Sequence, residues 1–289
     1  MRQYRWMRAA VLAAGIMASS VMAQALQTEA YAAVRRSAGA AVETEDRGPG
    51  VLGTDQSGAG TGELGADAAA SGTDAGAVER VHAAPAVSDG VIRPENLEGA
   101  KDADQLIVVV GTGGCHADTY YYKKSGDTWN LEWKEASVVG RGGITAQKAE
   151  GDGKTPAGTY GFTMAFGLKE DPGSILPYHK IVKGDYWVDD ASNPYYNKLV
   201  NTSVTPKTWN SAENLMAASP YYNYALALDY NQDCVPGKGS AIFLHCFTAS
   251  ADNGSAGCIR LPEARARELV QSATGQTRIV IAENLESLK

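Results

Sequence analysis

The chain has 289 residues, of which 44% are hydrophobic, and its formal net charge at pH 7 is −7. A chain of this length forms one or two domains, because a single hydrophobic core stops growing at about 250–300 residues. The negative net charge argues against a nucleic-acid-binding protein, which needs a basic surface, and no polybasic segment indicates attachment to a membrane surface.

The first 25 residues are typical of a bacterial export signal. Three arginines precede an apolar run over residues 9–21, and Ala23 and Ala25 then form a small-x-small cleavage site. The apolar run is also near the lower length limit for a membrane-spanning helix, so an uncleaved anchor is the alternative. We therefore expect an exported protein of the cell envelope, or a secreted one, that touches the membrane only through this segment if it is not cleaved.

Residues 26–103 are rich in Gly, Ala, Asp, Glu, Ser and Thr. Between residues 48 and 76 the large apolar residues are limited to Val51, Leu52 and Leu64. Such a segment buries too little apolar surface to offset the entropy lost on ordering. We predict a disordered acidic tether over residues 26–103, followed by a folded domain over residues 104–284.

The predicted domain begins with residues 106–110, an unbroken run of Leu, Ile and Val that is typical of a buried strand. Further short strands are expected at residues 119–123, 129–133, 137–139, 159–166, 186–188, 224–228 and 241–244. One helix is expected from Pro262, in its first turn, to Gly275, before a last strand at residues 277–282. Many short strands with one late helix predict a mainly β domain, either a sandwich or an open barrel.

Two glycine-rich stretches resemble cofactor motifs but lack residues that those motifs require. Residues 111–116 begin like a dinucleotide fingerprint, but His116 replaces the third glycine and no helical pattern follows. Residues 153–155 resemble the end of a phosphate-binding loop, but Lys148 stands in place of the opening glycine. The histidines and cysteines show no zinc-ligand spacing. We therefore expect neither a cofactor nor a metal.

His245 and Cys258 carry the strongest chemical signal. His245 closes an apolar stretch, and Cys258 follows Gly-Ser-Ala-Gly in a turn that is expected to lead into the helix at Pro262. Such a turn exposes a side chain and frees backbone N–H groups, which stabilise an oxyanion and lower the pKa of a thiol. A nearby histidine can take the thiol proton. We predict that Cys258 is a nucleophile and His245 its base, rather than two packed core residues.

This segment resembles the L,D-transpeptidase catalytic domain family, also called YkuD-like. His245 matches the first histidine of the family, and the turn matches through Ser255, Gly257, Cys258 and Arg260. Residues 151–158, Gly-Asp-Gly-Lys-Thr-Pro-Ala-Gly, are similar to the signature of the family's substrate-side hairpin. Two features depart from the pattern: Ala256 replaces a second histidine, and the spacing from His245 to Cys258 is short.

The resemblance implies that the thiolate of Cys258 attacks a peptidoglycan stem peptide, and that the amine of a second stem resolves the thioester into a cross-link. It also implies that the backbone carbonyl of Cys246 orients His245, and that Ser255, Gly257 and Arg260 shape the turn and bind substrate. Two alternatives stay open. One is an L,D-carboxypeptidase, in which water resolves the thioester, and the other is a catalytically silent cell-wall-binding module.

The other cysteines and the paired tyrosines are expected to have structural roles. Export permits disulfides, and a Cys115–Cys234 bridge would leave Cys258 reduced. Cys246 is expected to be packed or bridged. The adjacent pairs at residues 195–196 and 221–222 are more typical of packing than of a peptide groove.

Overall fold

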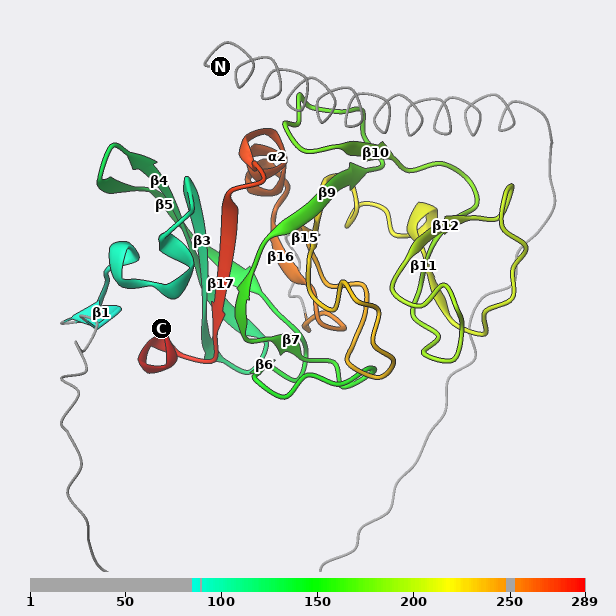
Figure 1. Ribbon diagram of the computed structural model, residues 1–289, viewed down its shortest axis with the longest axis horizontal. Helices are drawn as coiled ribbons and strands as arrows, with labels where there is room; N and C mark the ends of the chain where they lie inside the picture. Colours follow the sequence, from blue (N-terminus) through cyan, green and yellow to red (C-terminus); the bar gives the residue numbers. More distant parts are fainter. Residues whose placement is uncertain (1–84, 89, 248–252, 289) are drawn as a thin grey trace, which may run out of the picture. The chain divides into compact units, whose positions relative to one another are not determined.

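The computed structural model describes residues 85–88, 90–247 and 253–288 (Figure 1). The predicted export signal over residues 1–25 and the tether up to residue 84 lie outside the described residues. In the described part of the chain, no helix is both long and apolar enough to cross a membrane.

The main element is a ten-stranded sheet. In spatial order its strands are β10 (Tyr178–Lys180), β9 (Phe162–Gly167), β14 (Ala225–Leu228), β15 (Phe243–Phe247), β16 (Ile259–Pro262), β5 (Thr128–Val138), β4 (His116–Ser125), β3 (Gln105–Gly113), β17 (Thr277–Ala282) and β8 (Gly158–Tyr160). One residue separates β8 from β9 along the chain, yet they stand near opposite ends of this order. The sheet therefore curls until its two ends approach, and the predicted mainly β class is confirmed.

Strand β3 shows why the first apolar run is continuous rather than alternating. It pairs antiparallel with β4 and parallel with β17, so it has no free edge. Ile107 and Val109 face one buried cluster, whereas Leu106, Val108 and Val110 face another. Because both faces of the strand are covered, every position from 106 to 110 is apolar.

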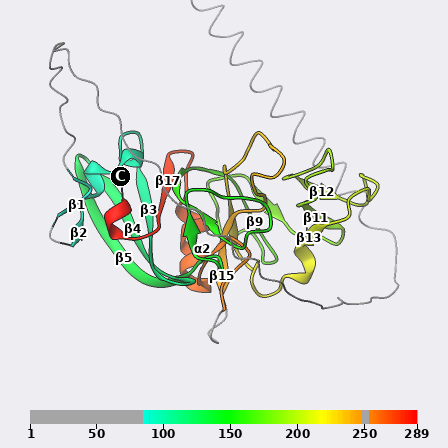
Figure 2. The same cartoon turned by 90° about the horizontal axis from the view of Figure 1, so that it is seen from below.

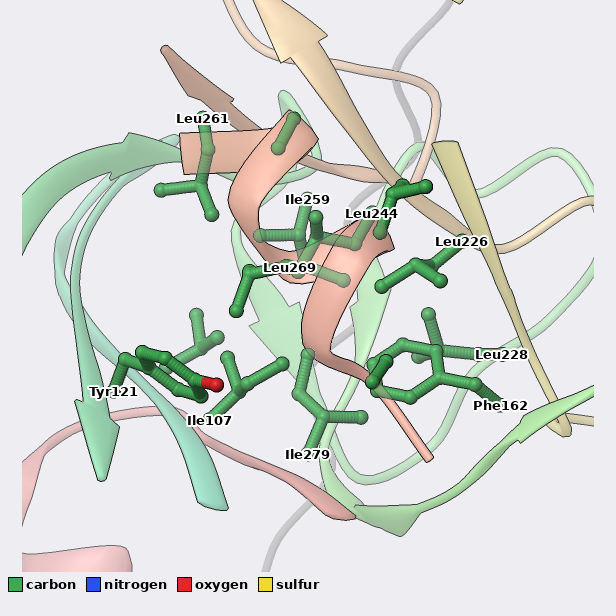
Figure 3. Packing of buried hydrophobic residues seen from close by; sticks show 14 of the residues in the cluster. Ile107, Tyr121, Phe162, Leu226, Leu228, Leu244, Ile259, Leu261, Leu269 and Ile279 are labelled. Atoms are coloured by element: carbon green, nitrogen blue, oxygen red, sulfur yellow. The ribbon is translucent and has the colours of Figure 1, made fainter. Parts of the chain in front are cut away.

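The larger core lies between the strands of the curled sheet and the helix α2 (Glu263–Ser272). Figure 3 shows Leu269 of α2 beside Ile259 and Leu244 of the sheet. Each of these side chains is at most 1% exposed. Burying one such side chain is worth about 1.5–3 kcal/mol, so the contact fixes α2 against β15 and β16.

The structure corrects the expected link between the Cys258 turn and the helix. The turn does not lead directly into α2, because the four residues of β16 intervene and Pro262 ends that strand as the helix N-cap. Ile259 and Leu261 are buried, whereas the residues between and after them are half-buried. This alternation is that of a strand, but four residues are too few for sequence periodicity to reveal it.

Residues 85–88 and 90–103 are ordered, whereas the sequence placed them in the disordered tether. They form β1 (Val87–Ser88), β2 (Val91–Ile92) and the 3-10 turns η1 (Pro94–Asn96) and η2 (Glu98–Ala100). Ile92 and Leu97 are buried in the cluster that covers one face of β3. A few apolar residues suffice here, because they fill a surface that the sheet already provides.

A second, three-stranded sheet has the order β12 (Leu199–Asn201), β11 (Asp185–Val188) and β13 (Ala212–Asn214), and 3-10 turn η3 (Leu215–Ala217) follows it. The Trp187 ring centroid lies 4.8 Å from that of Phe243 on β15 and 6.2 Å from that of Phe166 on β9. The small sheet is thus packed on the face of the large sheet opposite to α2. Figure 2 shows it far from β1 and β2.

Three short elements complete the fold. Strands β6 (Ile144–Thr145) and β7 (Thr155–Pro156) pair in parallel, and η4 (Leu285–Ser287) follows β17.

The packing of Leu97 can be tested against an exposed neighbour. Leu97 is 3% exposed, and Val91 is 56% exposed. Leu97→Ala is expected to lower the free energy of unfolding by about 2–5 kcal/mol, because it leaves a cavity against β3. Val91→Ala is expected to change it by less than about 0.5 kcal/mol. Urea denaturation measures both values, and equal effects would contradict the ordered packing of this segment.

Candidate active site

The pairing of two parallel strands brings His245 and Cys258 to one face of the large sheet. On β15 and β16, Leu244 pairs with Ile259, and His245 pairs with Arg260. Neighbouring residues of a strand point to opposite faces. Leu244 and Ile259 face the core beneath α2. Cys258, His245 and Arg260 therefore share the other face, on which the small sheet packs.

The thiol of Cys258 is enclosed. Its Sγ donates to the carbonyl of Ala241 at 3.2 Å and accepts from the N–H of Phe243 at 3.4 Å, and the residue is 5% exposed. Burial raises the pKa of the Cys258 thiol to about 12, and the Glu213 carboxylate also raises it. The Phe243 N–H and two nearby cations lower the pKa only in part.

The sequence-based expectation of a lowered thiol pKa is therefore wrong. It assumed an exposed turn at a helix N-terminus, where the peptide dipoles favour a thiolate. Strand β16 separates Cys258 from α2, and Cys258 is buried in a cluster that contains several aromatic side chains. Desolvation then outweighs the local donors.

The imidazole of His245 is held in one orientation. Its Nδ1 lies 2.9 Å from the carbonyl oxygen of Cys246, which is the contact that the family resemblance implied. A carbonyl only accepts hydrogen bonds, so Nδ1 carries the hydrogen and Nε2 has the lone pair that can take a proton. The Tyr222 ring packs edge-on against the imidazole, with centroids 4.9 Å apart, and His245 is 2% exposed.

Ser255 closes the turn that presents Cys258. Its Oγ accepts from the N–H of Gly257 at 2.9 Å and donates to the carbonyl of Cys258 at 2.6 Å. Gly257 has a φ of 150°, and a Cβ there would lie 2.9 Å from the carbonyl oxygen of Lys154. The turn thus needs a hydroxyl at position 255 and a glycine at position 257.

The segment over residues 139–155, which includes part of the predicted hairpin signature, lies directly against this turn. Gly140 forms a parallel bridge with Ser255. The Arg141 N–H donates to the Ser255 carbonyl, and the Ser255 N–H donates to the Val139 carbonyl, both at 2.9 Å. The Thr155 hydroxyl donates to the Gly257 carbonyl at 2.8 Å. Two motifs about 100 residues apart in the sequence are therefore parts of one structure.

The contacts of Asp152 explain why the hairpin signature has an acidic residue at this position. It accepts from Lys148 Nζ at 2.6 Å and from the N–H groups of Ala149 and Lys154, both at 2.9 Å. Burial alone raises the pKa of Asp152, but these donors outweigh it and hold the pKa below its usual value. Lys148 is 4% exposed, so the pair fixes a buried cation near the turn.

Arg260 lies over an aromatic side chain. The centre of its guanidinium is 4.7 Å from the Tyr221 ring centroid, and the residue is half-buried. A cation stacked in this way keeps its charge beside the site while its planar donors stay in a defined orientation.

Half-buried Glu213 and buried Tyr222 form a pair that sequence reasoning missed. Glu213 on β13 accepts a short hydrogen bond from the Tyr222 hydroxyl. Burial raises the pKa of Glu213 to about 7, whereas the Tyr222 bond and Arg260 lower it. The acids Asp189 and Glu150 raise it further. No local pattern marks Glu213, because the partners that define its environment come from distant segments.

The other three cysteines are unbridged, and their surroundings differ. Cys234 is a reduced thiol that donates to the Gln232 carbonyl at 3.4 Å, so the predicted bridge to Cys115 is wrong. Cys246 is 1% exposed and packs in the core under α2. Within residues 85–88, 90–247 and 253–288, no His, Cys, Asp or Glu side chains form a group of three or more that could hold a metal ion.

The sequence over residues 105–281 matches a family model described as the L,D-transpeptidase catalytic domain, YkuD. The match covers more than half of the chain. The chain belongs to this family. Its members are cysteine-dependent L,D-transpeptidases, so the family predicted from the His245 and Cys258 segments is confirmed. No curated protein matches the chain.

Several solved structures are similar to this family member. Bd1075 of Bdellovibrio bacteriovorus is 16% identical with a TM-score of 0.35, and the alignment covers 65% of this chain and 51% of Bd1075. An L,D-transpeptidase of Mycobacterium smegmatis is 13% identical, with 62% and 58% covered and a TM-score of 0.30. One of Enterococcus faecium is 15% identical, with 63% and 50% covered and a TM-score of 0.30. The chain thus spans about half of the length of Bd1075.

The charge on Glu213 can be tested through the pH dependence of stability. The pKa of Glu213 is about 7 in the folded chain, against 4.5 for an unperturbed glutamate, so folding favours the protonated acid. Its stabilising contribution is complete below about pH 4.5 and is lost as the pH rises to about 7. Glu213→Gln removes the titrating charge and keeps an acceptor for Tyr222. We expect the variant to need more urea than wild type for unfolding at pH 8, and a similar amount at pH 5.

Glu170→Gln is the matched control, because the Glu170 side chain is 88% exposed. It is expected to change the urea midpoint little at either pH. A Glu213→Gln effect of equal size at pH 5 and pH 8 would contradict desolvation of the Glu213 charge as its cause.

Proposed function

We propose that this chain is an L,D-transpeptidase that cross-links peptidoglycan stem peptides, with Cys258 as nucleophile and His245 as base. The observation that carries the proposal is the placement of both side chains on one face of adjacent parallel strands. The fixed tautomer of His245 and the family match support it.

The first half of the reaction forms a thioester. The proton of Cys258 moves to Nε2 of His245 while Sγ attacks a carbonyl carbon of the donor stem peptide. Because burial disfavours an isolated thiolate, proton transfer and attack are coupled, which is the task of a general base. The tetrahedral intermediate then expels the amine of the leaving residue, which takes the proton from His245.

The second half transfers the acyl group. The amine of a second stem gives a proton to His245 and attacks the thioester carbon, and the Cys258 thiolate leaves and regains a proton. The Arg260 guanidinium holds a carboxylate of the stem, since a planar cation suits that group. Water in place of the amine gives the alternative, an L,D-carboxypeptidase, and the third candidate is a wall-binding module without turnover.

We further propose that residues 1–25 direct export to the cell envelope and that residues 26–84 form a tether for the folded domain. N-terminal sequencing of protein recovered from the envelope is expected to begin near residue 26. A first residue of Met1 would indicate an uncleaved anchor instead.

The decisive experiment follows a disaccharide-tetrapeptide incubated with the purified protein. A cross-linked dimer, seen by mass spectrometry, is the expected product. A shortened monomer without dimer would favour the carboxypeptidase. Unchanged substrate retained by folded protein would favour the wall-binding module and would refute the transpeptidase proposal.

Substitutions then assign the roles. Cys258→Ala is expected to abolish turnover with little loss of stability, because it removes one sulfur atom from a turn. His245→Ala is expected to lower the rate by about 10²–10⁴-fold, the usual worth of a general base. The matched control is Cys246→Ala, which keeps the backbone carbonyl that orients His245 and is expected to retain most of the activity. A thioester adduct mapped to Cys246, or full activity of Cys258→Ala, would show that the nucleophile is misassigned.

A further inference from the structure

Thr155 is a buried polar residue that the mechanism above does not use. It lies on β7 and is 0% exposed. Its Oγ1 accepts from the Gly140 N–H and donates to the Gly257 carbonyl, both at 2.8 Å. The second bond joins the hairpin to the turn of the nucleophile across 102 positions of the sequence.

The hydrogen bond from Thr155 to Gly257 fixes the direction of the Cys258 N–H as well as that of the Gly257 carbonyl. The Gly257 carbonyl and the Cys258 N–H belong to the same peptide group, which is planar and trans, so the two point in opposite directions. Gly257 itself does not fix this plane, because a residue without Cβ has wide conformational freedom. Holding the carbonyl toward Thr155 therefore sets the direction of the Cys258 N–H.

Two neighbouring N–H groups of the turn are already engaged. The Gly257 N–H donates to the Ser255 hydroxyl at 2.9 Å, and the Ser255 N–H donates to the Val139 carbonyl at 2.9 Å. The Cys258 N–H belongs to the residue whose Sγ is proposed to attack. It is thus the donor of this turn best placed for an oxygen bonded to the attacked carbon.

We propose that Thr155 is a positioning residue that aims the Cys258 N–H at the oxygen of the attacked carbonyl, which makes this N–H an oxyanion donor. The inference rests on the proposed function. When the S–C bond forms, the π pair of the carbonyl moves to oxygen, and the N–H stabilises that charge. When the intermediate collapses, the pair returns to the carbon–oxygen bond and the leaving amine departs.

Only a hydroxyl side chain meets both demands at this position. It must accept from Gly140 and donate to Gly257 within one small, dry space. Valine has a similar volume and offers neither function, whereas serine offers both without the methyl group. Thr155→Val and Thr155→Ser therefore separate hydrogen bonding from packing.

The test compares two reactions of Cys258. Alkylation by iodoacetamide displaces iodide at a saturated carbon and develops no oxyanion. Acylation by a carbapenem proceeds through a tetrahedral oxyanion. For Thr155→Val we expect the alkylation rate and its pH profile to stay within about twofold of wild type. We expect acylation to fall by about 10–10²-fold, less than the about 10²–10³-fold typical of deleting a donor, because the N–H is displaced and not lost. Thr155→Ser is expected to restore most of the acylation rate.

The matched control is Thr119→Val. Thr119 is also 0% exposed, and its hydroxyl donates to Ser137 at 2.7 Å, between β4 and β5, and not to the Cys258 turn. Thr119→Val is expected to be less stable than wild type, with the same ratio of the acylation rate to the alkylation rate. Equal losses in both reactions for Thr155→Val, or no loss in either, would overturn the role of Thr155.

A measurement on the wild type keeps the proposal testable even if Thr155→Val does not fold. With ¹⁵N-cysteine labelling, the Cys258 amide proton is expected to move downfield when a peptide aldehyde forms a hemithioacetal. No such shift would overturn the proposal. A wild type that is alkylated at Cys258 but never acylated would instead refute the proposed function, and the role of Thr155 with it.

Discussion

The parallel pairing of β15 with β16 is the constraint on which the rest of the site depends. It sets His245 opposite Arg260 and puts Cys258 on the same face, while Leu244 and Ile259 anchor the pair to the core beneath α2. A shift of one residue in this register would send one of the two strands' functional side chains into the core. The apolar residues of these strands therefore specify the chemistry as firmly as the polar ones do.

Burial gives the site its electrostatic character. The small sheet and the aromatic rings around Phe243 exclude water from Cys258, and they also make the Glu213 carboxylate costly to ionise. In such surroundings each charge acts strongly on its neighbours, because little solvent screens it. The pKa values of the Cys258 thiol and the Glu213 carboxyl are both raised. Arg260 lowers both values and Lys148 lowers that of the thiol, but only in part.

How much could be predicted from the sequence depends on how far apart along the chain the interacting residues lie. The strand at residues 106–110 and the helix after Pro262 are encoded by local patterns, and the Cys258 turn is encoded by a motif. Strand β16 was missed because four residues carry too little periodicity. Thr155 and Glu213 acquire their surroundings only when distant segments meet, and residues 90–103 fold because β3 offers them a surface. No pattern within the sequence records those contacts.

The alternation of side chains between the two faces of β15 also affects how readily the Cys258 thiol is oxidised. Cys246 follows His245 directly and so projects into the core, on the opposite side of the sheet from Cys258. Two sulfurs on opposite faces cannot form a disulfide without displacing the backbone. Oxidants and disulfides react with thiolates and not with thiols, so a cysteine held protonated by burial reacts slowly until its own substrate arrives. For a protein exported as proposed, the enclosure of Cys258 would thus preserve the proposed nucleophile as well as shape its reaction.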